Sequence, residues 1–312
     1  MKNLFNEVRS FLYRNAREVE LSLWKYFFED GSKIAVVNAL MVYQNEDGGF
    51  GHALEADNWN PNSTPITTEH ALKILKNIDF MDMNHPIYHG IWKYLLSEKD
   101  LLDYGWRFTI PSNDDYPHAP WWNYSEKENE KEYYGVTTHF CAFILEYGDK
   151  TSALYHKAER MLEQLLQIFV TDQYFGDMGL EGYIFLIDTV SELKMTKYDI
   201  HNLQEILCKK ITQSIEHDIS KWANYGVRPS NFIKSPDCPF YEANKEIVQA
   251  ELKYLIDTKP EQDVWPITWT WFDNMDKYSK YFYVSENRWK CFKAIEKMMF
   301  LNKFGIIGDV RI

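Results

Sequence analysis

Three side chains that can exchange protons lie within one short stretch, at His52, Glu55 and Asp57, and Trp59 follows them. A carboxyl group that is desolvated by neighbouring rings keeps its proton to higher pH, and it can then act as a general acid. Helix capping and loop hydrogen bonding are the alternative roles for such carboxylates. We predict that, if the protein is an enzyme, His52, Glu55 and Asp57 are catalytic and one of the two carboxyls is the acid.

Two further segments concentrate aromatic rings in irregular sequence. Residues 116–122 read Tyr-Pro-His-Ala-Pro-Trp-Trp, and residues 265–271 read Trp-Pro-Ile-Thr-Trp-Thr-Trp. Flat indole faces can stabilise a carbocation, stack on a sugar or simply fill space between helices. We predict a pocket whose substrate-binding residues are Trp59, His118, Trp121, Trp122, Trp265, Trp269 and Trp271.

A glycine motif precedes the acidic stretch, because residues 44–51 read Gln-Asn-Glu-Asp-Gly-Gly-Phe-Gly. An acidic residue followed by two glycines marks a tight turn with positive φ, and the amide of Gln44 can bind backbone groups around it. This motif resembles the glutamine–tryptophan repeat of the terpenoid cyclase and prenyltransferase superfamily, which includes squalene–hopene cyclases, with Phe50 where Trp is common. The resemblance implies an α/α toroid, in which paired helices form an inner and an outer ring.

The known catalytic signatures of that superfamily are missing. The Asp-x-Asp-Asp motif of class II cyclases has its nearest counterpart at residues 112–115, which lack the first Asp, so we expect the acid at Glu55 or Asp57 rather than at Asp114. No Asp-Asp-x-x-Asp motif is present to hold Mg²⁺. The pair Asp237-Cys238 does not have the spacing of the prenyltransferase zinc ligands. We therefore predict no metal and no cofactor.

Apolar residues at helical spacing predict about ten to twelve helices and no convincing set of strands. The expected helices span 16–29, 33–43, 86–98, 135–147, 151–171, 181–194, 199–218, 242–256 and 285–303, with a cap at Ser32 for the second of them. A further helix is expected to be capped by Thr67 or Thr68 and to run through Ile78. Three long irregular segments separate them, at 99–134, 219–241 and 257–283. We predict a single all-α domain over residues 1–312, with the α/α toroid as its architecture.

The composition of the chain limits the classes of partner that we expect it to bind. The net charge is −12 and the pI is near 5.3, so a basic face for nucleic acid or for an anionic membrane is not expected. Four cysteines lie far apart without a CxxC motif, which is typical of reduced thiols in the cytoplasm. No apolar run is long enough to cross a membrane, and the first residues lack the apolar region of a signal peptide. The oligomeric state is not predictable from these features.

For the function we expect, from the resemblance, a protein that binds an isoprenoid-like apolar ligand in an aromatic-lined central cavity and, as an enzyme, cyclises or otherwise transforms it. Two alternatives stay open. One is a carbohydrate-active toroid with Glu55 and Asp57 as paired carboxylates and Trp121, Trp122 and Trp269 as sugar platforms. The other is a non-catalytic helical scaffold. In either enzyme, loops 52–66, 111–124 and 265–271 should converge on one cavity.

Overall fold

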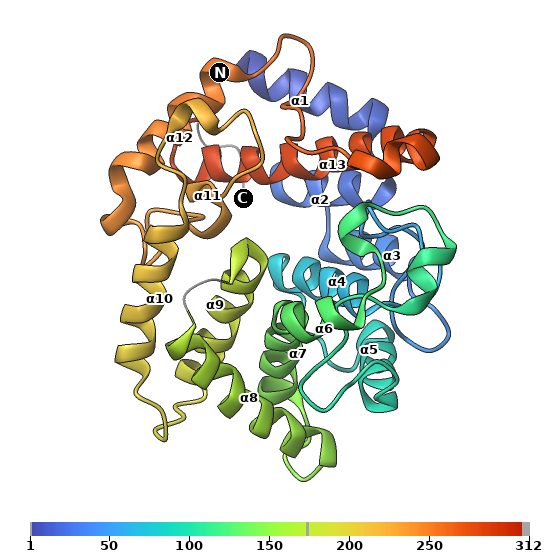
Figure 1. Cartoon of the computed structure of the whole chain (residues 1–312). Coiled ribbons are helices and arrows are strands. Elements are labelled where there is room, and N and C mark those ends of the chain that lie inside the picture. The colour runs from blue at the N-terminus through green and yellow to red at the C-terminus, as the bar shows by residue number, and fades with distance from the viewer. Residues whose placement is uncertain (1, 173–174, 308–312) are drawn as a thin grey trace.

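The computed structural model describes residues 2–172 and 175–307, and this part of the chain is helical (Figure 1). It contains thirteen α-helices and five short 3₁₀ helices, with isolated β-bridges but no strand, which confirms the all-α prediction for the described residues. The α-helices are α1 (Lys2–Asn15), α2 (Glu18–Phe28), α3 (Lys33–Met41), α4 (Pro65–Asn77), α5 (Pro86–Ser97), α6 (Glu126–Glu132), α7 (Tyr134–Tyr147), α8 (Ala153–Thr171), α9 (Gly176–Glu192), α10 (Ile200–Ser214), α11 (Pro229–Phe232), α12 (Lys245–Thr258) and α13 (Met275–Lys303).

Helices α4, α7, α9 and α13 lie toward the middle of the view in Figure 1, whereas α1, α5, α8, α10 and α12 lie nearer the rim. Helix α7 is buried all along the stretch from Gly135 to Leu145, which fits its position between neighbours. It packs closely against α9, because a Cβ on Gly182 would lie only 2.0 Å from Thr138 Oγ1. The apolar core therefore runs between the middle helices and the rim helices.

The start of α4 differs from the sequence expectation. Its cap is Thr64, whose hydroxyl accepts a hydrogen bond from Thr67 N at 3.1 Å, so Thr67 and Thr68 lie inside the helix. Pro65 occupies the first helical position, where its missing N–H leaves no bond unmade. The proline and the threonine before it are the local signal for this boundary.

The last helix also begins earlier than expected, at Met275 rather than at residue 285. A kink at Tyr278, with φ −128° and ψ 20°, interrupts its first turns. The residues around the kink are aromatic and lack a single apolar face, so helical periodicity is hidden there. The count of helices also exceeds the prediction because α1 was not expected, and α6 and α11 are short helices inside segments expected to be irregular.

The glycine turn is fastened to α5 by the side chain of Gln44. Its Nε2 donates to Gly48 O and to Ile87 O, both at 2.9 Å, which confirms the expected binding of backbone groups. Gly48 has φ +90°, and a Cβ there would lie 1.9 Å from Gly90 O. Only glycine permits this close approach of the two backbones.

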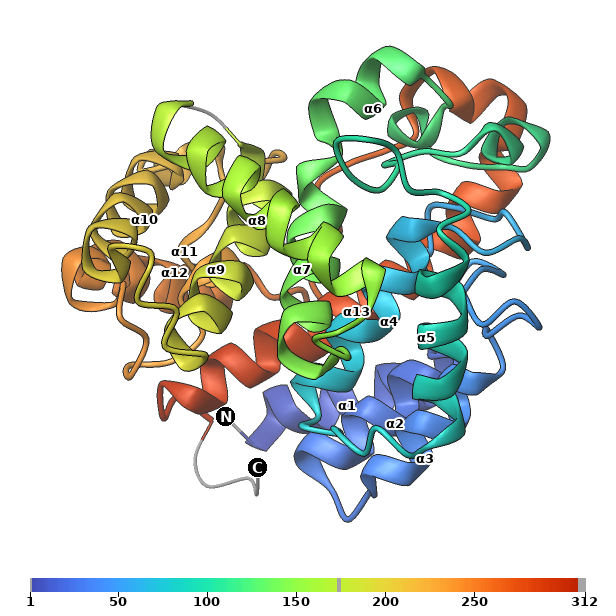
Figure 2. The ribbon, with the colours of Figure 1, turned by 90° about the horizontal axis from the view of Figure 1, so that it is seen from below.

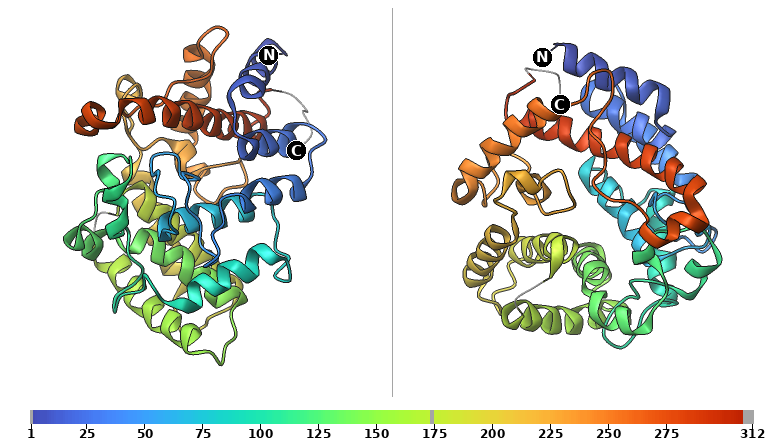
Figure 3. Two further views of the ribbon diagram at one scale, coloured as in Figure 1. Left: turned by 90° about the vertical axis from the view of Figure 1, so that its right-hand side faces the viewer. Right: turned by 45° about the horizontal axis from the view of Figure 1, so that its top comes forward.

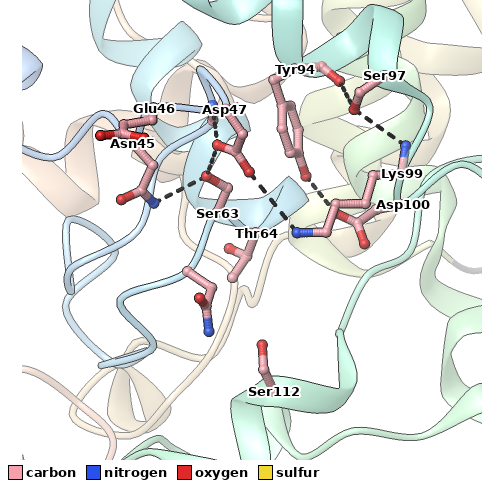
Figure 4. Close-up of polar contacts among 12 residues, drawn as sticks. Asn45, Glu46, Asp47, Ser63, Thr64, Tyr94, Ser97, Lys99, Asp100 and Ser112 are labelled. Atoms are coloured by element: carbon pink, nitrogen blue, oxygen red, sulfur yellow. Dashed lines mark hydrogen bonds and ion pairs between the residues drawn. The ribbon is translucent and has the colours of Figure 1, made fainter.

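A second set of polar contacts ties the same turn to the loop before α4 (Figure 4). Asp47 Oδ1 accepts from Gly49 N at 3.1 Å and from Ser63 Oγ at 2.5 Å. Asn45 Nδ2 donates to the same Ser63 oxygen at 3.0 Å. The segment that carries Glu55 and Asp57 therefore leaves from and returns to one fixed turn.

Gln44→Ala is expected to lower the free energy of unfolding by about 1–3 kcal/mol, because the carbonyls of Gly48 and Ile87 would lose their donor. Urea unfolding measures the change. Gln167→Ala, on the exposed side of α8, is the matched control and should stay within about 0.5 kcal/mol of the wild type. Equal effects of the two substitutions would show that the Gln44 contacts contribute nothing.

Candidate functional site

The three aromatic loops meet at one end of the molecule, whereas the cavity that they were expected to line stays a prediction. Trp59 N donates to Pro117 O and Ala119 N donates to Asp57 O, both at 2.9 Å, so the first two loops lie side by side. The third loop joins them through Asn274, just beyond it, whose Nδ2 donates to His118 O at 2.8 Å. Figure 2 shows the corresponding green and orange segments next to each other, beside α6.

Asp57 lies at this meeting point and binds two indoles from the third loop. Its Oδ1 accepts from Trp271 Nε1 at 2.8 Å, and its Oδ2 accepts from Trp269 Nε1 at 3.0 Å. Burial raises the pKa of Asp57 to about 6, although the N–H groups of Trp271 and Trp269 act to lower it. Near neutral pH the side chain is therefore mostly a carboxylate held by neutral donors.

Glu55 lies beside Asp57 in a different environment. Glu55 is only 6% exposed, and its Oε2 has no hydrogen-bond partner within the described residues. Burial raises the pKa of Glu55 well above its ordinary value, and the charge of Asp57 raises it further. The two environments thus differ, because burial and the neighbouring charge favour the protonated form of Glu55, whereas two indole N–H groups bind the oxygens of Asp57.

The backbone between the glycine turn and Glu55 is held in an unusual conformation. His52 and Ala53 both have φ of 57°, in the left-handed region that non-glycine residues rarely adopt. Arg17, at the start of α2, donates to Ala53 O, and Ser285 Oγ of α13 donates to Ala56 O at 2.5 Å. Contacts from two helices therefore maintain the strained segment, as is common at functional sites.

The two histidines that the sequence nominated are engaged elsewhere. His52 is exposed, and its Nε2 lies 2.8 Å from Asn45 Oδ1. His118 is buried, with Nδ1 2.6 Å from Tyr116 O and Nε2 2.7 Å from Asn123 Oδ1. Both rings thus fix loop conformation in this structure, and neither of them contacts a carboxyl of the Glu55–Asp57 pair through these bonds.

The nominated tryptophans divide into several groups. Trp122 is buried with 3% exposure, whereas its neighbour Trp121 is 36% exposed. Trp59 donates to the hydroxyl of Ser285 and has the guanidinium of Arg288 4.4 Å from its ring centre. The indoles of Trp269 and Trp271 both bind Asp57, as described above. Trp265 is buried, and its Nε1 donates at 2.8 Å to a carbonyl near the end of α12, so it binds that helix instead.

Trp289 of α13 also belongs to the site, although the sequence analysis did not single it out. Its ring centre lies 5.7 Å from that of Trp269 and 6.1 Å from that of His70. Its buried Nε1 makes no hydrogen bond of normal geometry within the described residues, but the N–H lies close enough to Asp57 to act as a donor that lowers the pKa of that carboxyl. Its position on the apolar face of a helix gave no local signal of this role.

A separate charged network joins α4, α7 and α9. Lys73 pairs with Glu181 and lies 3.6 Å from Glu69 Oε1, and His139 Nδ1 lies 3.1 Å from the same Glu69 oxygen. Burial raises the pKa of Glu181, but the charges of Lys73 and Lys234, together with the hydrogen bond from Lys73, outweigh it and hold that pKa at about 2. Burial lowers the pKa of His139 and favours a neutral ring. Lys73, Glu69 and Glu181 are paired charges at helix contacts, whereas His139 Nε2 is buried without a hydrogen-bond partner within the described residues. No local pattern marks this network, because its members are distant along the chain.

Within residues 2–172 and 175–307, no three His, Cys, Asp or Glu side chains are grouped so that they could hold a metal ion. Asp237 and Cys238, considered above as zinc ligands, are therefore not part of such a group. Among the described helices, none combines the length and the apolar character that crossing a membrane requires.

Comparisons with other proteins add no family name to this site. No protein-family model, no curated protein and no solved structure matches the chain. The chemistry of the site therefore has to follow from its own residues.

Proposed function

We propose that the helices form an α/α toroid. An inner ring is supported by the contacts of α13 with α2, of α4 with α7, of α7 with α9 and of α9 with α11. The pairing of α2 with α3, of α7 with α8 and of α9 with α10 supports an outer layer. The right-hand view of Figure 3, in which helices surround a central gap in the ribbon, agrees with this arrangement.

We propose further that the protein binds an isoprenoid-like apolar substrate and transforms it by acid catalysis. The observation that carries this proposal is the buried pair of Glu55 and Asp57 among indole rings, in which Asp57 accepts from Trp269 and Trp271 while burial favours the protonated form of Glu55. In the first step the proton of Glu55 passes to a substrate carbon, and the electrons of the C=C bond form the new C–H bond. The resulting cation is stabilised by the ring quadrupoles and by the Asp57 carboxylate until loss of a proton ends the reaction.

The two other functions have less support from the geometry. Sugar platforms need exposed ring faces, but Trp122 is buried and Trp269 is only partly exposed, so Trp121 is the single exposed ring among the three expected platforms. A scaffold without chemistry gives no reason for two adjacent buried carboxyls, since burial of an ionisable group destabilises the fold unless the group is compensated.

The pH dependence of turnover tests this assignment. For an isoprenoid substrate identified by screening, kcat/KM should rise about tenfold per pH unit as the pH increases toward about 6, where Asp57 becomes a carboxylate. At higher pH it should fall as Glu55 loses its proton, because a raised pKa places that loss on the alkaline side. Asp57→Asn should remove the acidic limb. A rate that increases steadily with acidity, or no turnover of any isoprenoid, would reject the proposal.

A further inference from the structure

A pocket lies between α4, α5, α7 and α9, away from the aromatic loops that carry the proposed acid. Its volume is about 40 Å³, and a single water molecule needs only roughly 10–15 Å³. Most of its lining is apolar, and it includes the rings of Tyr88, Phe143, Tyr147 and Phe185. The imidazole of His139 also lines the pocket, and it is the group whose hydrogen-bonding capacity the fold leaves unused.

The two nitrogens of His139 have different surroundings. Nδ1 lies 3.0 Å from the carbonyl oxygen of Gly135 and 3.1 Å from Glu69 Oε1. Because a carbonyl oxygen can only accept, Nδ1 is the nitrogen that carries the hydrogen in the neutral ring. Burial lowers the pKa of His139 and so favours that neutral ring. Nε2 then has a bare lone pair, on a residue that is only 6% exposed, and it has no partner within the described residues.

The donors that line the pocket do not satisfy this nitrogen. Lys73, Tyr88 and Tyr147 each donate to another oxygen of the protein. Lys76 is exposed at the rim, and its ammonium lies 4.5 Å from the ring centre of Phe185. The pocket therefore opens to solvent beside Lys76, and it offers a buried acceptor among aromatic rings without a donor to complete it. Buried polar groups without a partner are rare in folded proteins, so a ligand is the natural source of that donor.

We propose that this pocket binds a small phenol, whose hydroxyl group donates a hydrogen bond to Nε2 of His139. A phenol fits because its O–H is the donor that the pocket lacks, and its ring can contact Phe185 and Tyr147, which are both partly exposed. Since the pocket opens beside Lys76, the part of the ring remote from the hydroxyl can lie at the mouth. Glu69 contacts the opposite nitrogen of the imidazole and holds the ring in the required orientation.

Titration of the full chain, labelled with ¹⁵N at its histidine rings, with two probes of equal shape tests this inference. The probes are phenol and toluene, in which a methyl group replaces the hydroxyl. A purely apolar pocket would favour toluene, because toluene is the more hydrophobic molecule. We expect the opposite order, with phenol bound about tenfold more tightly, which corresponds to about 1.4 kcal/mol. Phenol should also shift the Nε2 resonance of His139 upfield, as accepting a hydrogen bond does, whereas toluene should not.

Two variants assign the signal and locate the acceptor. His139→Asn keeps a side-chain donor close to the place of Nδ1 but has no Nε2, so it should lose both the shifted resonance and the preference for phenol. His156→Asn, at an exposed position on α8, should keep both. An Nε2 resonance that phenol does not move, tighter binding of toluene, or an unchanged preference in His139→Asn would each overturn the proposal. Because the comparison of the two probes uses the wild-type chain, poor folding of a variant does not affect it.

Discussion

Glu55→Gln is expected to lower the turnover of an isoprenoid substrate by about 10²–10⁴-fold, the usual contribution of a positioned general acid. Glutamine keeps the size of the side chain but has no acidic proton at any working pH. The loss should appear in kcat more than in KM, because the proton moves only in the chemical step. Steady-state kinetics on the substrate found by screening measure the effect.

The matched control for this prediction is Asp114→Asn. Asp114 is 53% exposed, and its Oδ1 accepts from Tyr124 N at 2.9 Å, so it has a structural role in its own loop. Its replacement should leave kcat/KM unchanged. Loss of activity in Asp114→Asn together with full activity in Glu55→Gln would show that the acid is Asp114 and not Glu55. Circular dichroism and urea unfolding of both variants exclude loss of fold as the cause.

Local sequence patterns were enough to predict many of the helices and one of their caps. The helix at 151–171 has a continuous apolar stripe, and the structure places α8 at Ala153–Thr171. Ser32 was expected to cap the helix that follows it, and its Oγ accepts from Ala35 N at 3.2 Å. These features depend on residues within one or two helical turns of each other. The first turns of α13 were not predictable in this way, because a kink at Tyr278 breaks the repeat.

The candidate site was predictable only in part, because local sequence patterns connect only residues that are close together along the chain. Glu55 and Asp57 are two residues apart and follow a recognisable glycine turn, so the sequence marks them as a pair. The alternation of Trp269 and Trp271 indicated a common side, and both do bind one carboxylate. Trp289 lies more than two hundred residues from that carboxylate along the chain, and no local pattern connects them.

Arg17→Met is expected to destabilise the fold by about 3–5 kcal/mol, the usual effect of removing one member of a buried ion pair. Arg17 Nε lies 3.0 Å from Glu20 Oε1, and the Glu20 side chain is fully buried, so the carboxylate would be left without its counter-ion. The same guanidinium also donates to Ala53 O and, at 3.2 Å, to Leu54 O. Since total stabilities are about 5–15 kcal/mol, the variant should lose a large part of its stability and also the position of Glu55.

The double variant Arg17→Met/Glu20→Leu distinguishes an unpaired charge from lost packing. Removal of both charges should recover much of the stability, because the buried carboxylate is then gone, but the donors to Ala53 O and Leu54 O stay lost. Urea unfolding should therefore show that the free energy of unfolding recovers, whereas steady-state kinetics should show that turnover stays low. Arg14→Met, on the exposed side of α1, should change stability by less than about 0.5 kcal/mol. An equally small change in Arg17→Met would mean that the Arg17–Glu20 pair supports neither the fold nor the strained segment that holds Glu55.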